Sequence, residues 1–200
     1  NVHNKLSADC ATNKKRLIEG KRVKQFTEVT VNFDPPQLEA GMLVVDGLFG
    51  SGLNKPLAGG FAAMVKYINQ SAAKIVSIDL PSGLMSEDNS YNISANIIRA
   101  DLTLTLQQKK LSMMMADNQQ YLGRIKVLDI RLSPEFIQRT ESRCSILEEK
   151  DIRQLLKPRG DFAHKGSMGT ALLIAGSYGM SGASVLATRA CLRTGVGKVI

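Results

Sequence analysis

Met42-Leu43-Val44-Val45-Asp46 is an uninterrupted apolar run that ends in an acid, and Lys74-Ile75-Val76-Ser77-Ile78-Asp79-Leu80 repeats the pattern. Such runs are typical of strands buried on both faces of a parallel sheet. Between them, residues 47–60 are rich in glycine and predict a loop. Residues 61–68 carry apolar side chains at helical spacing and predict an amphipathic helix. Strand, helix and strand together form a βαβ unit.

Further strands are expected on both sides of this unit. Residues 101–106 and 124–130 predict two strands, and the spacing of all these segments favours a mostly parallel, layered α/β domain. Nearer the start, residues 7–19 predict a helix ended by Gly20, and the alternating residues 26–33 predict a strand.

A second α/β unit is expected after a boundary near residues 135–150. Residues 133–150 lose their periodicity and are interpreted as a connection, followed by a short helix at 148–156. Residues 170–176 then predict a buried strand, and residues 183–194 a helix ended by Gly195. The chain ends inside what is interpreted as a starting strand and does not begin with Met, so it is expected to be a fragment.

The composition is that of a globular protein. The chain has 200 residues, 44% of them hydrophobic and 22% charged, with a net charge of +8. Much of the positive charge lies between Asn13 and Lys24, where no aromatic residues accompany it, so no nucleic-acid partner is expected. Three widely spaced cysteines favour a reducing, cytoplasmic location. No apolar segment approaches the roughly 20 residues that span a bilayer, so no membrane association is expected.

The first candidate site combines Asp46-Gly47-Leu48-Phe49-Gly50-Ser51-Gly52 with Asp79-Leu80-Pro81-Ser82-Gly83. Ligands of open parallel sheets bind outside the carboxyl ends of the strands, so the two acids are expected to meet at one crevice. Gly50 and Gly52 would let backbone N–H groups approach a phosphate. The alternative interpretation is that both acids simply cap the turns that follow them.

The second candidate site combines His164-Lys165-Gly166-Ser167-Met168-Gly169 with Gly176-Ser177-Tyr178-Gly179-Met180-Ser181-Gly182-Ala183. A strand, a glycine-rich loop and a helix amino terminus together favour anion binding, because the free N–H groups and the helix dipole attract phosphate. The alternative is that these glycines only permit close packing of the helix.

In these motifs the chain resembles the bifunctional NAD(P)H-hydrate repair enzymes, in which an NAD(P)HX epimerase precedes an ATP- or ADP-dependent NAD(P)HX dehydratase. The first candidate site, followed by Ala100-Asp101-Leu102-Thr103-Leu104-Thr105 and Lys110, carries the epimerase resemblance. The second candidate site, followed by Arg193-Thr194-Gly195-Val196-Gly197, carries the dehydratase resemblance. Both motif sets occur in the family's order.

The resemblance implies a three-layer Rossmann-like epimerase domain at residues 1–140, lacking its N-terminal part. It also implies the truncated beginning of a ribokinase-like dehydratase domain at residues 141–200. The implied activities are those of an isomerase and a lyase in metabolite repair. The epimerase interconverts R and S hydrates of NADH and NADPH, and the dehydratase uses ATP or ADP to return the S form to NAD(P)H.

The resemblance also assigns site residues. Asp46 and Ser82 would hold a potassium ion, which suits hard oxygen donors. Asp46 and Asp79 would be the catalytic residues, with Asp79 also contacting the substrate. The remaining substrate contacts would come from Gly50, Ser51, Gly52, Leu53, Asn54, Lys55, Pro56 and Ala183. ADP or ATP would serve the dehydratase, and a homo-oligomer is possible.

Three departures from the family pattern stand out. Lys109 occupies a position where proline is usual, an upstream Asn- and Gly-rich loop is absent, and so is the later nucleotide motif of the dehydratase. Two other functions remain open. The chain could be a non-catalytic dinucleotide-binding or protein-interaction scaffold, or a small-molecule kinase related to ribokinase.

Overall fold

The computed structural model describes residues 6–20, 23–29, 34–156 and 158–200. These residues divide into two compact units, Asn1–Glu141 and Ser142–Ile200, and each unit is described by itself.

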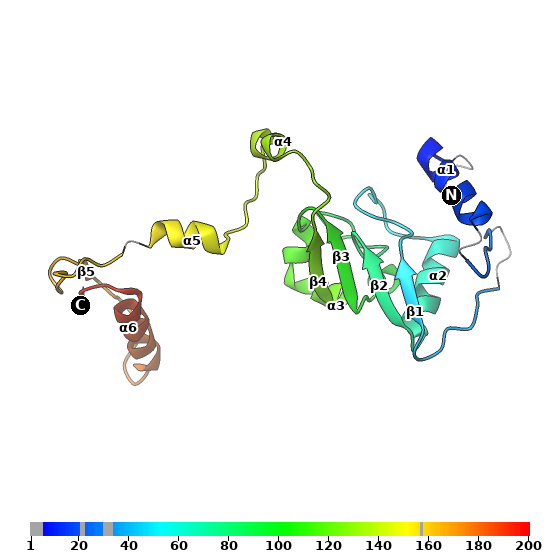
Figure 1. The fold of residues 1–200 in the computed structure, drawn as a ribbon. Coiled ribbons are helices and arrows are strands. Elements are labelled where there is room, and N and C mark those ends of the chain that lie inside the picture. Colours follow the sequence, from blue (N-terminus) through cyan, green and yellow to red (C-terminus); the bar gives the residue numbers. More distant parts are fainter. Residues whose placement is uncertain (1–5, 21–22, 30–33, 157) are drawn as a thin grey trace. The chain divides into compact units, whose positions relative to one another are not determined.

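The first unit is built on a four-stranded parallel sheet with the strands in chain order (Figure 1). Its strands are β1 (Leu43–Asp46), β2 (Lys74–Ile78), β3 (Leu102–Leu106) and β4 (Arg124–Leu128). Asp46 is in register with Ser77, and Ile78 with Leu104. The strands predicted at residues 42–46, 74–80, 101–106 and 124–130 and the parallel α/β class are thereby confirmed for this unit.

The crossovers that join these strands contain one long helix and several short ones. Helix α2 (Gly59–Gln70) joins β1 to β2, and its buried side chains follow the predicted helical spacing. The 3₁₀ turn η1 (Ser94–Asn96) lies between β2 and β3. Between β3 and β4 lie three short elements: η2 (Leu111–Met114), η3 (Ala116–Asn118) and α3 (Gln119–Leu122).

Two hydrophobic clusters form the core of this unit. One lies between α2 and β2 and consists of Leu57, Ala62, Val65, Ile68, Ile75, Ile98 and Ala100. The other joins the turn after β2 to segments that precede β3 and β4, and consists of Leu80, Leu84, Ile97, Met113, Tyr121 and Leu122. Together they fix the turn after β2 against the elements that precede and follow β3.

The expectation that the first strand is buried on both faces is wrong. Val44 packs against the core beneath α2, whereas Leu43 is 62% and Val45 61% exposed. β1 is the edge strand of the sheet, and within the described residues its second face carries no covering helix. A continuous apolar run therefore does not by itself prove burial on both faces.

The segments that flank the sheet agree only in part with the sequence. Helix α1 (Ala8–Glu19) is confirmed, with the Ser7 hydroxyl accepting a hydrogen bond from the Cys10 N–H at its start. No strand forms over residues 26–29, and residues 30–33 of that prediction lie outside the described residues. The predicted connection after β4 instead contains a short helix, α4 (Pro134–Arg139), which Ser133 caps.

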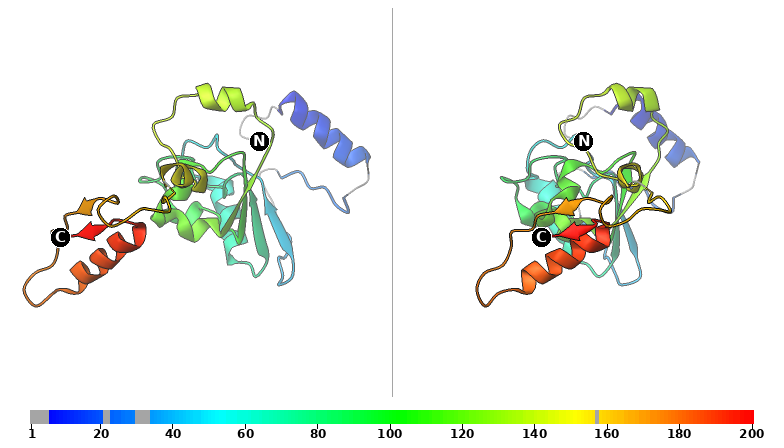
Figure 2. Two further views of the ribbon diagram at one scale, coloured as in Figure 1. Left: turned by 60° about the vertical axis from the view of Figure 1, so that its left-hand side comes forward. Right: turned by 90° about the vertical axis from the view of Figure 1, so that its left-hand side faces the viewer.

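The described residues of the second unit form two helices and two short strands. They are α5 (Glu149–Leu155), β5 (Thr170–Ala171), α6 (Gly182–Thr194) and β6 (Lys198–Val199). β5 and β6 pair in parallel, and Figure 2 shows this pair beside α6.

The expectation of a buried strand over residues 170–176 is wrong. The strand ends at Ala171, and Leu172 and Ile174 are 71% and 91% exposed. A two-stranded pair offers too little surface to bury them. Among the described residues of either unit, no helix is long and apolar enough to cross a membrane.

Candidate functional site

The first candidate site lies at the carboxyl ends of β1 and β2. Asp46 is the last residue of β1, and Asp79 directly follows β2. The loop after β1 contacts both acids through its backbone. The Leu48 N–H donates to Asp46 Oδ1 at 3.4 Å, and the Ser51 N–H donates to Asp79 Oδ2 at 3.2 Å. One loop thus joins the two strand ends, where ligands of parallel sheets bind.

Asp46 is enclosed by neutral hydrogen-bond donors. Its Oδ2 accepts from the Ser77 hydroxyl and from the Ser82 N–H, each at 2.8 Å. Its Oδ1 accepts from the Ser82 hydroxyl at 2.5 Å. Asp46 is 2% exposed and both serines are fully buried. This network joins β1, β2 and the turn after β2, so turn capping is part of what Asp46 does.

The backbone of the turn after β2 requires a glycine. Gly83 has a φ of +99°, and a Cβ there would lie 2.2 Å from the carbonyl oxygen of Asn96. The Asn96 side chain in turn donates to the Leu57 carbonyl at 2.7 Å. The turn that carries Ser82 is thereby held tightly against η1 and the end of the 50–56 loop.

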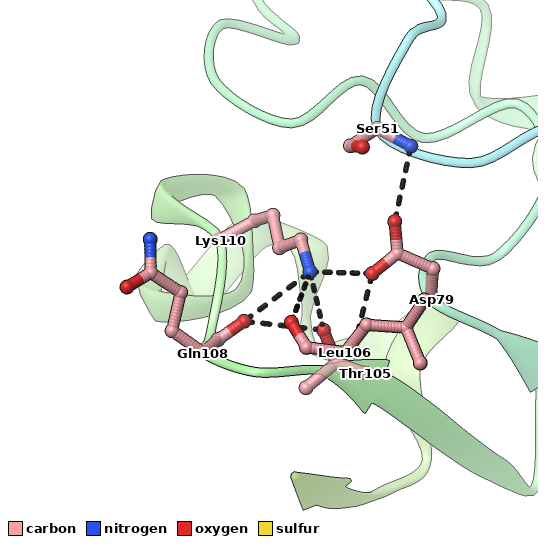
Figure 3. Close-up of polar contacts among 6 residues, drawn as sticks. All are labelled: Ser51, Asp79, Thr105, Leu106, Gln108 and Lys110. Atoms are coloured by element: carbon pink, nitrogen blue, oxygen red, sulfur yellow. Dashed lines mark hydrogen bonds and ion pairs between the residues drawn. The ribbon is translucent and has the colours of Figure 1, made fainter. Parts of the chain in front are cut away.

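Asp79 has a different set of partners, drawn from three segments (Figure 3). Its Oδ1 forms an ion pair with Lys110 and accepts from the Leu106 N–H at 3.2 Å, whereas its Oδ2 accepts from the Ser51 N–H. The Asp79 side chain is 13% exposed. None of these donors belongs to the turn that follows Asp79, so turn capping does not explain this carboxylate.

The backbone of Asp79 is also unusual. Its φ is +67°, in the left-handed region that aspartate and asparagine tolerate better than most residues. Its N–H donates to the Leu104 carbonyl of β3 at 2.8 Å, which fixes the turn to the neighbouring strand.

The surroundings of Asp79 favour its charged form. Partial burial acts to raise the pKa of the carboxyl group. The hydrogen bond from Lys110, those from the Leu106 and Ser51 N–H groups and the attraction of the Lys110 charge outweigh it. The pKa of Asp79 is consequently lowered below its ordinary value of 3.8. At neutral pH the group is a carboxylate.

Lys110 contacts Asp79 in this site, although sequence reasoning assigned it no role. It lies 31 residues from Asp79 and precedes η2, so only the paired strands β2 and β3 bring the two together. Its presence at the end of the third epimerase motif was the available signal. Ser77, the buried partner of Asp46, was also missed because it appeared to be an ordinary strand residue.

The predicted substrate loop is only partly in contact with the acids. A Cβ on Gly50 would lie 3.3 Å from Asp79 Oδ2, and Ser51 donates to that oxygen. The side chains of Leu53 and Pro56 are half-buried. Gly52, Asn54 and Lys55 are exposed.

The loops of the second candidate site are exposed except at Met168, which is half-buried. Ala183 is the second residue of α6 and is exposed. The His164 ring nitrogen Nδ1 accepts from the Gly166 N–H at 3.1 Å, so this imidazole supports its own turn. Both residues belong to the second unit.

The oxygen atoms of Asp46 and Ser82 are hard ligands of the kind that suits an alkali cation. In the part of the chain that the structure describes, no cationic side chain forms an ion pair with this buried carboxylate. The Phe49 carbonyl oxygen lies 3.3 Å from the Ser82 hydroxyl oxygen, which adds another hard donor. Within the same residues, no three His, Cys, Asp or Glu side chains are grouped to hold a metal ion.

Comparison with known proteins gives the chain a family. The model of the YjeF-related protein N-terminus matches residues 1–112. The bifunctional NAD(P)H-hydrate repair enzyme of Coxiella burnetii is 34% identical over 84% of this chain and 34% of its own length. The bifunctional enzyme of Dictyoglomus turgidum is 31% identical over 92% of this chain and 34% of its own length. The NAD(P)H-hydrate epimerase of Limosilactobacillus fermentum is 31% identical over 52% of this chain and 49% of its own length.

The chain spans about a third of the length of the bifunctional relatives. The family match covers β1, β2 and β3 together with Asp46, Asp79, Ser82 and Lys110. On this match, the chain belongs to the family of YjeF-related protein N-terminal domains.

Proposed function

We propose that the first unit acts as an NAD(P)H-hydrate epimerase. The observation that carries the proposal is the asymmetric setting of Asp79. One carboxylate oxygen is held by Lys110 and Leu106, and the other accepts, among the described residues, from the Ser51 N–H of the 50–56 loop alone. The names of relatives that match the chain, a repair enzyme and an epimerase of NAD(P)H hydrates, support the same reaction.

The chemistry requires one group that can accept and return a proton. Water adds to an enamine at the carbon next to nitrogen, so the hydrate carries its hydroxyl there. Asp79 Oδ2 takes the hydroxyl proton while the bond from that carbon to nitrogen breaks, and the electron pair goes to the conjugated nitrogen. An aldehyde forms. The nitrogen then attacks the opposite face of the aldehyde carbon, and the proton returns to the oxygen.

The remaining residues of the site bind and orient. We propose that Gly50, which has no side chain, leaves room for the dinucleotide beside Asp79, with Leu53 and Pro56 supplying apolar contact. Asp46 and Ser82 would hold a potassium ion, which would supply positive charge for an anionic substrate. Replacing K⁺ by choline should then lower the epimerisation rate of the wild-type chain, and an unchanged rate would contradict this part.

The test of the epimerase uses one pure hydrate epimer as substrate. The wild-type chain should form the other epimer faster than a protein-free control, as followed by chromatography. Asp79→Asn should slow this reaction about 100-fold or more, the usual contribution of a proton-transfer group. Asp88→Asn is the matched control, because Asp88 is an exposed acid outside the site. A wild-type rate equal to the protein-free rate would refute the proposal.

We further propose that residues 141–200 form the beginning of an ATP- or ADP-dependent dehydratase domain of ribokinase-like fold. The match to the bifunctional Dictyoglomus turgidum enzyme covers 92% of the chain and therefore extends past Glu141 into the second unit. The glycine-rich segment before α6 is where a nucleotide phosphate would lie. The protein containing this chain should consume the S hydrate only when ATP or ADP is added.

A further inference from the structure

The ammonium group of Lys110 is surrounded by oxygen atoms of its own chain. Besides Asp79 Oδ1, its Nζ donates to the Thr105 hydroxyl at 3.0 Å, the Leu106 carbonyl at 2.9 Å and the Gln108 carbonyl at 3.3 Å (Figure 3). An ammonium has three hydrogens, fewer than the acceptors that surround it. The Lys110 side chain is 15% exposed. Lys110 therefore has no hydrogen left for a ligand.

This arrangement leaves the two oxygens of Asp79 in different states. Oδ1 is occupied by Lys110 and the Leu106 N–H, while Oδ2 has the Ser51 N–H as its one hydrogen-bond partner among the described residues. A carboxylate oxygen accepts about two hydrogen bonds, so Oδ2 keeps a free lone pair. That lone pair belongs to the oxygen that contacts the predicted substrate loop.

We propose that Lys110 is a positioning residue, which keeps Asp79 ionised and turned so that Oδ2, rather than Oδ1, exchanges the proton with substrate. The inference rests on the proposed epimerase function, because it assigns Asp79 its partner in that reaction. Lys110 itself neither donates a proton nor binds the dinucleotide.

The surroundings of Asp79 make this dependence strong. Of the residues that the structure describes, Lys110 is the one charged group recorded against the Asp79 carboxylate; its other partners are the neutral Leu106 and Ser51 N–H groups. Partial burial opposes the charge of Asp79, so loss of Lys110 removes the main influence that lowers its pKa.

The neighbouring Lys109 provides a matched control. It has the same charge and side chain and is exposed, and no hydrogen bond or ion pair of its side chain is recorded among the described residues. Lys109→Met therefore removes one positive charge one residue away without touching Asp79. Lys110→Met removes both charge and hydrogen bonds, whereas Lys110→Gln removes the charge and keeps two N–H donors.

The first measurement needs no substrate. The Asp79 carboxyl carbon is titrated by NMR in ¹³C-aspartate-labelled chains and assigned by its absence in Asp79→Asn. The midpoint should move to higher pH in Lys110→Met and Lys110→Gln, stay in place in Lys109→Met, and remain near the wild-type position in Lys110→Arg. If Lys110→Met does not fold, Lys110→Gln gives the same answer. An unmoved midpoint in the folded variant overturns the proposal.

The second measurement is the pH profile of epimerisation. In Lys110→Gln, kcat should fall about 10- to 100-fold with KM little changed, and the acidic limb should shift to higher pH. A raised KM with unchanged kcat would show that Lys110 binds substrate and would overturn the inference. If the Asp79 midpoint moves in the Lys110 variants but the wild-type chain has no epimerase activity, the proposed function is refuted and the link between Lys110 and Asp79 stands.

Discussion

Asp46 and Asp79 occupy corresponding ends of two neighbouring parallel strands, yet their carboxylates are satisfied in opposite ways. In the part of the chain that the structure describes, Asp46 accepts hydrogen bonds from neutral donors alone, on Leu48, Ser77 and Ser82, and it is almost completely buried. Asp79 is paired with the cation of Lys110, and one of its oxygens keeps a free lone pair. The first arrangement joins backbone segments, and the second stabilises a carboxylate charge next to a cation.

The comparison shows that position at a strand end does not determine what an acid does. What differs is the source of the donors. Those around Asp46 come from β2 and from turns, while the strongest partner of Asp79 comes from the segment after β3. Variants that affect stability and activity separately can therefore distinguish the two acids.

The largest expected effect is on stability, from Asp46→Ala. The substitution leaves the Ser77 hydroxyl and the Ser82 N–H buried without their acceptor, and leaves the Ser82 hydroxyl with the Phe49 carbonyl at 3.3 Å. The free energy of unfolding should fall by about 3 kcal/mol, because each buried unsatisfied group costs about 1–3 kcal/mol and the costs partly overlap. Urea unfolding followed by circular dichroism measures it.

Asp129→Ala is the control for that experiment. Asp129 is exposed and accepts from the Arg131 N–H at 2.8 Å, so its loss should change the free energy of unfolding by about 0.5 kcal/mol or less. Equal effects of the two substitutions would show that burial of the Asp46 network does not matter to stability.

A smaller effect is expected from Gly50→Ala, and it concerns activity. The new Cβ would lie 3.3 Å from Asp79 Oδ2, so the carboxylate has to shift by a few tenths of an ångström. Epimerisation should slow about 10-fold, since reaction rates are sensitive to small displacements of a reacting group. Gly60→Ala in α2, whose Cβ would meet nothing within 4 Å, should leave the rate unchanged. Equal rates for both variants would contradict the expected role of Gly50.

The smallest effect is on the pH dependence of stability. Because the folded-state pKa of Asp79 is lowered below 3.8, its ionisation stabilises the fold above that pH. The contribution is lost as the pH falls through the folded-state pKa. The difference in unfolding free energy between the wild type and Asp79→Asn should thus be constant near neutral pH and shrink below 3.8. A difference that grows on acidification would mean that the pKa is raised instead.

Much of the sheet was predictable because its signals are local. The apolar runs before Asp46 and Asp79 formed β1 and β2, and the helical spacing from Phe61 onward formed part of α2. The exposure of Val45 was not predictable, since it depends on which elements cover the sheet. The short helix α4 was missed because its 6 residues, fewer than two helical turns, are too few for a periodic signal.

The two acids were predictable as site residues, but their partners were not. The Asp79–Lys110 pair joins residues 31 apart in sequence, and it requires both the parallel register of β2 with β3 and the turn that follows β3. The Ser77 contact depends on the register of β1 with β2. Neither contact leaves a spacing pattern in one sequence.

The left-handed backbone at Asp79 has a consequence for which replacements this position tolerates. Glutamate would keep the negative charge, but it adopts this conformation poorly and its longer side chain would move the carboxylate away from Lys110 and Ser51. Asparagine would keep the backbone and lose the charge. In a saturation library, selection for folding should therefore retain asparagine and glycine, whereas selection for turnover should retain aspartate alone.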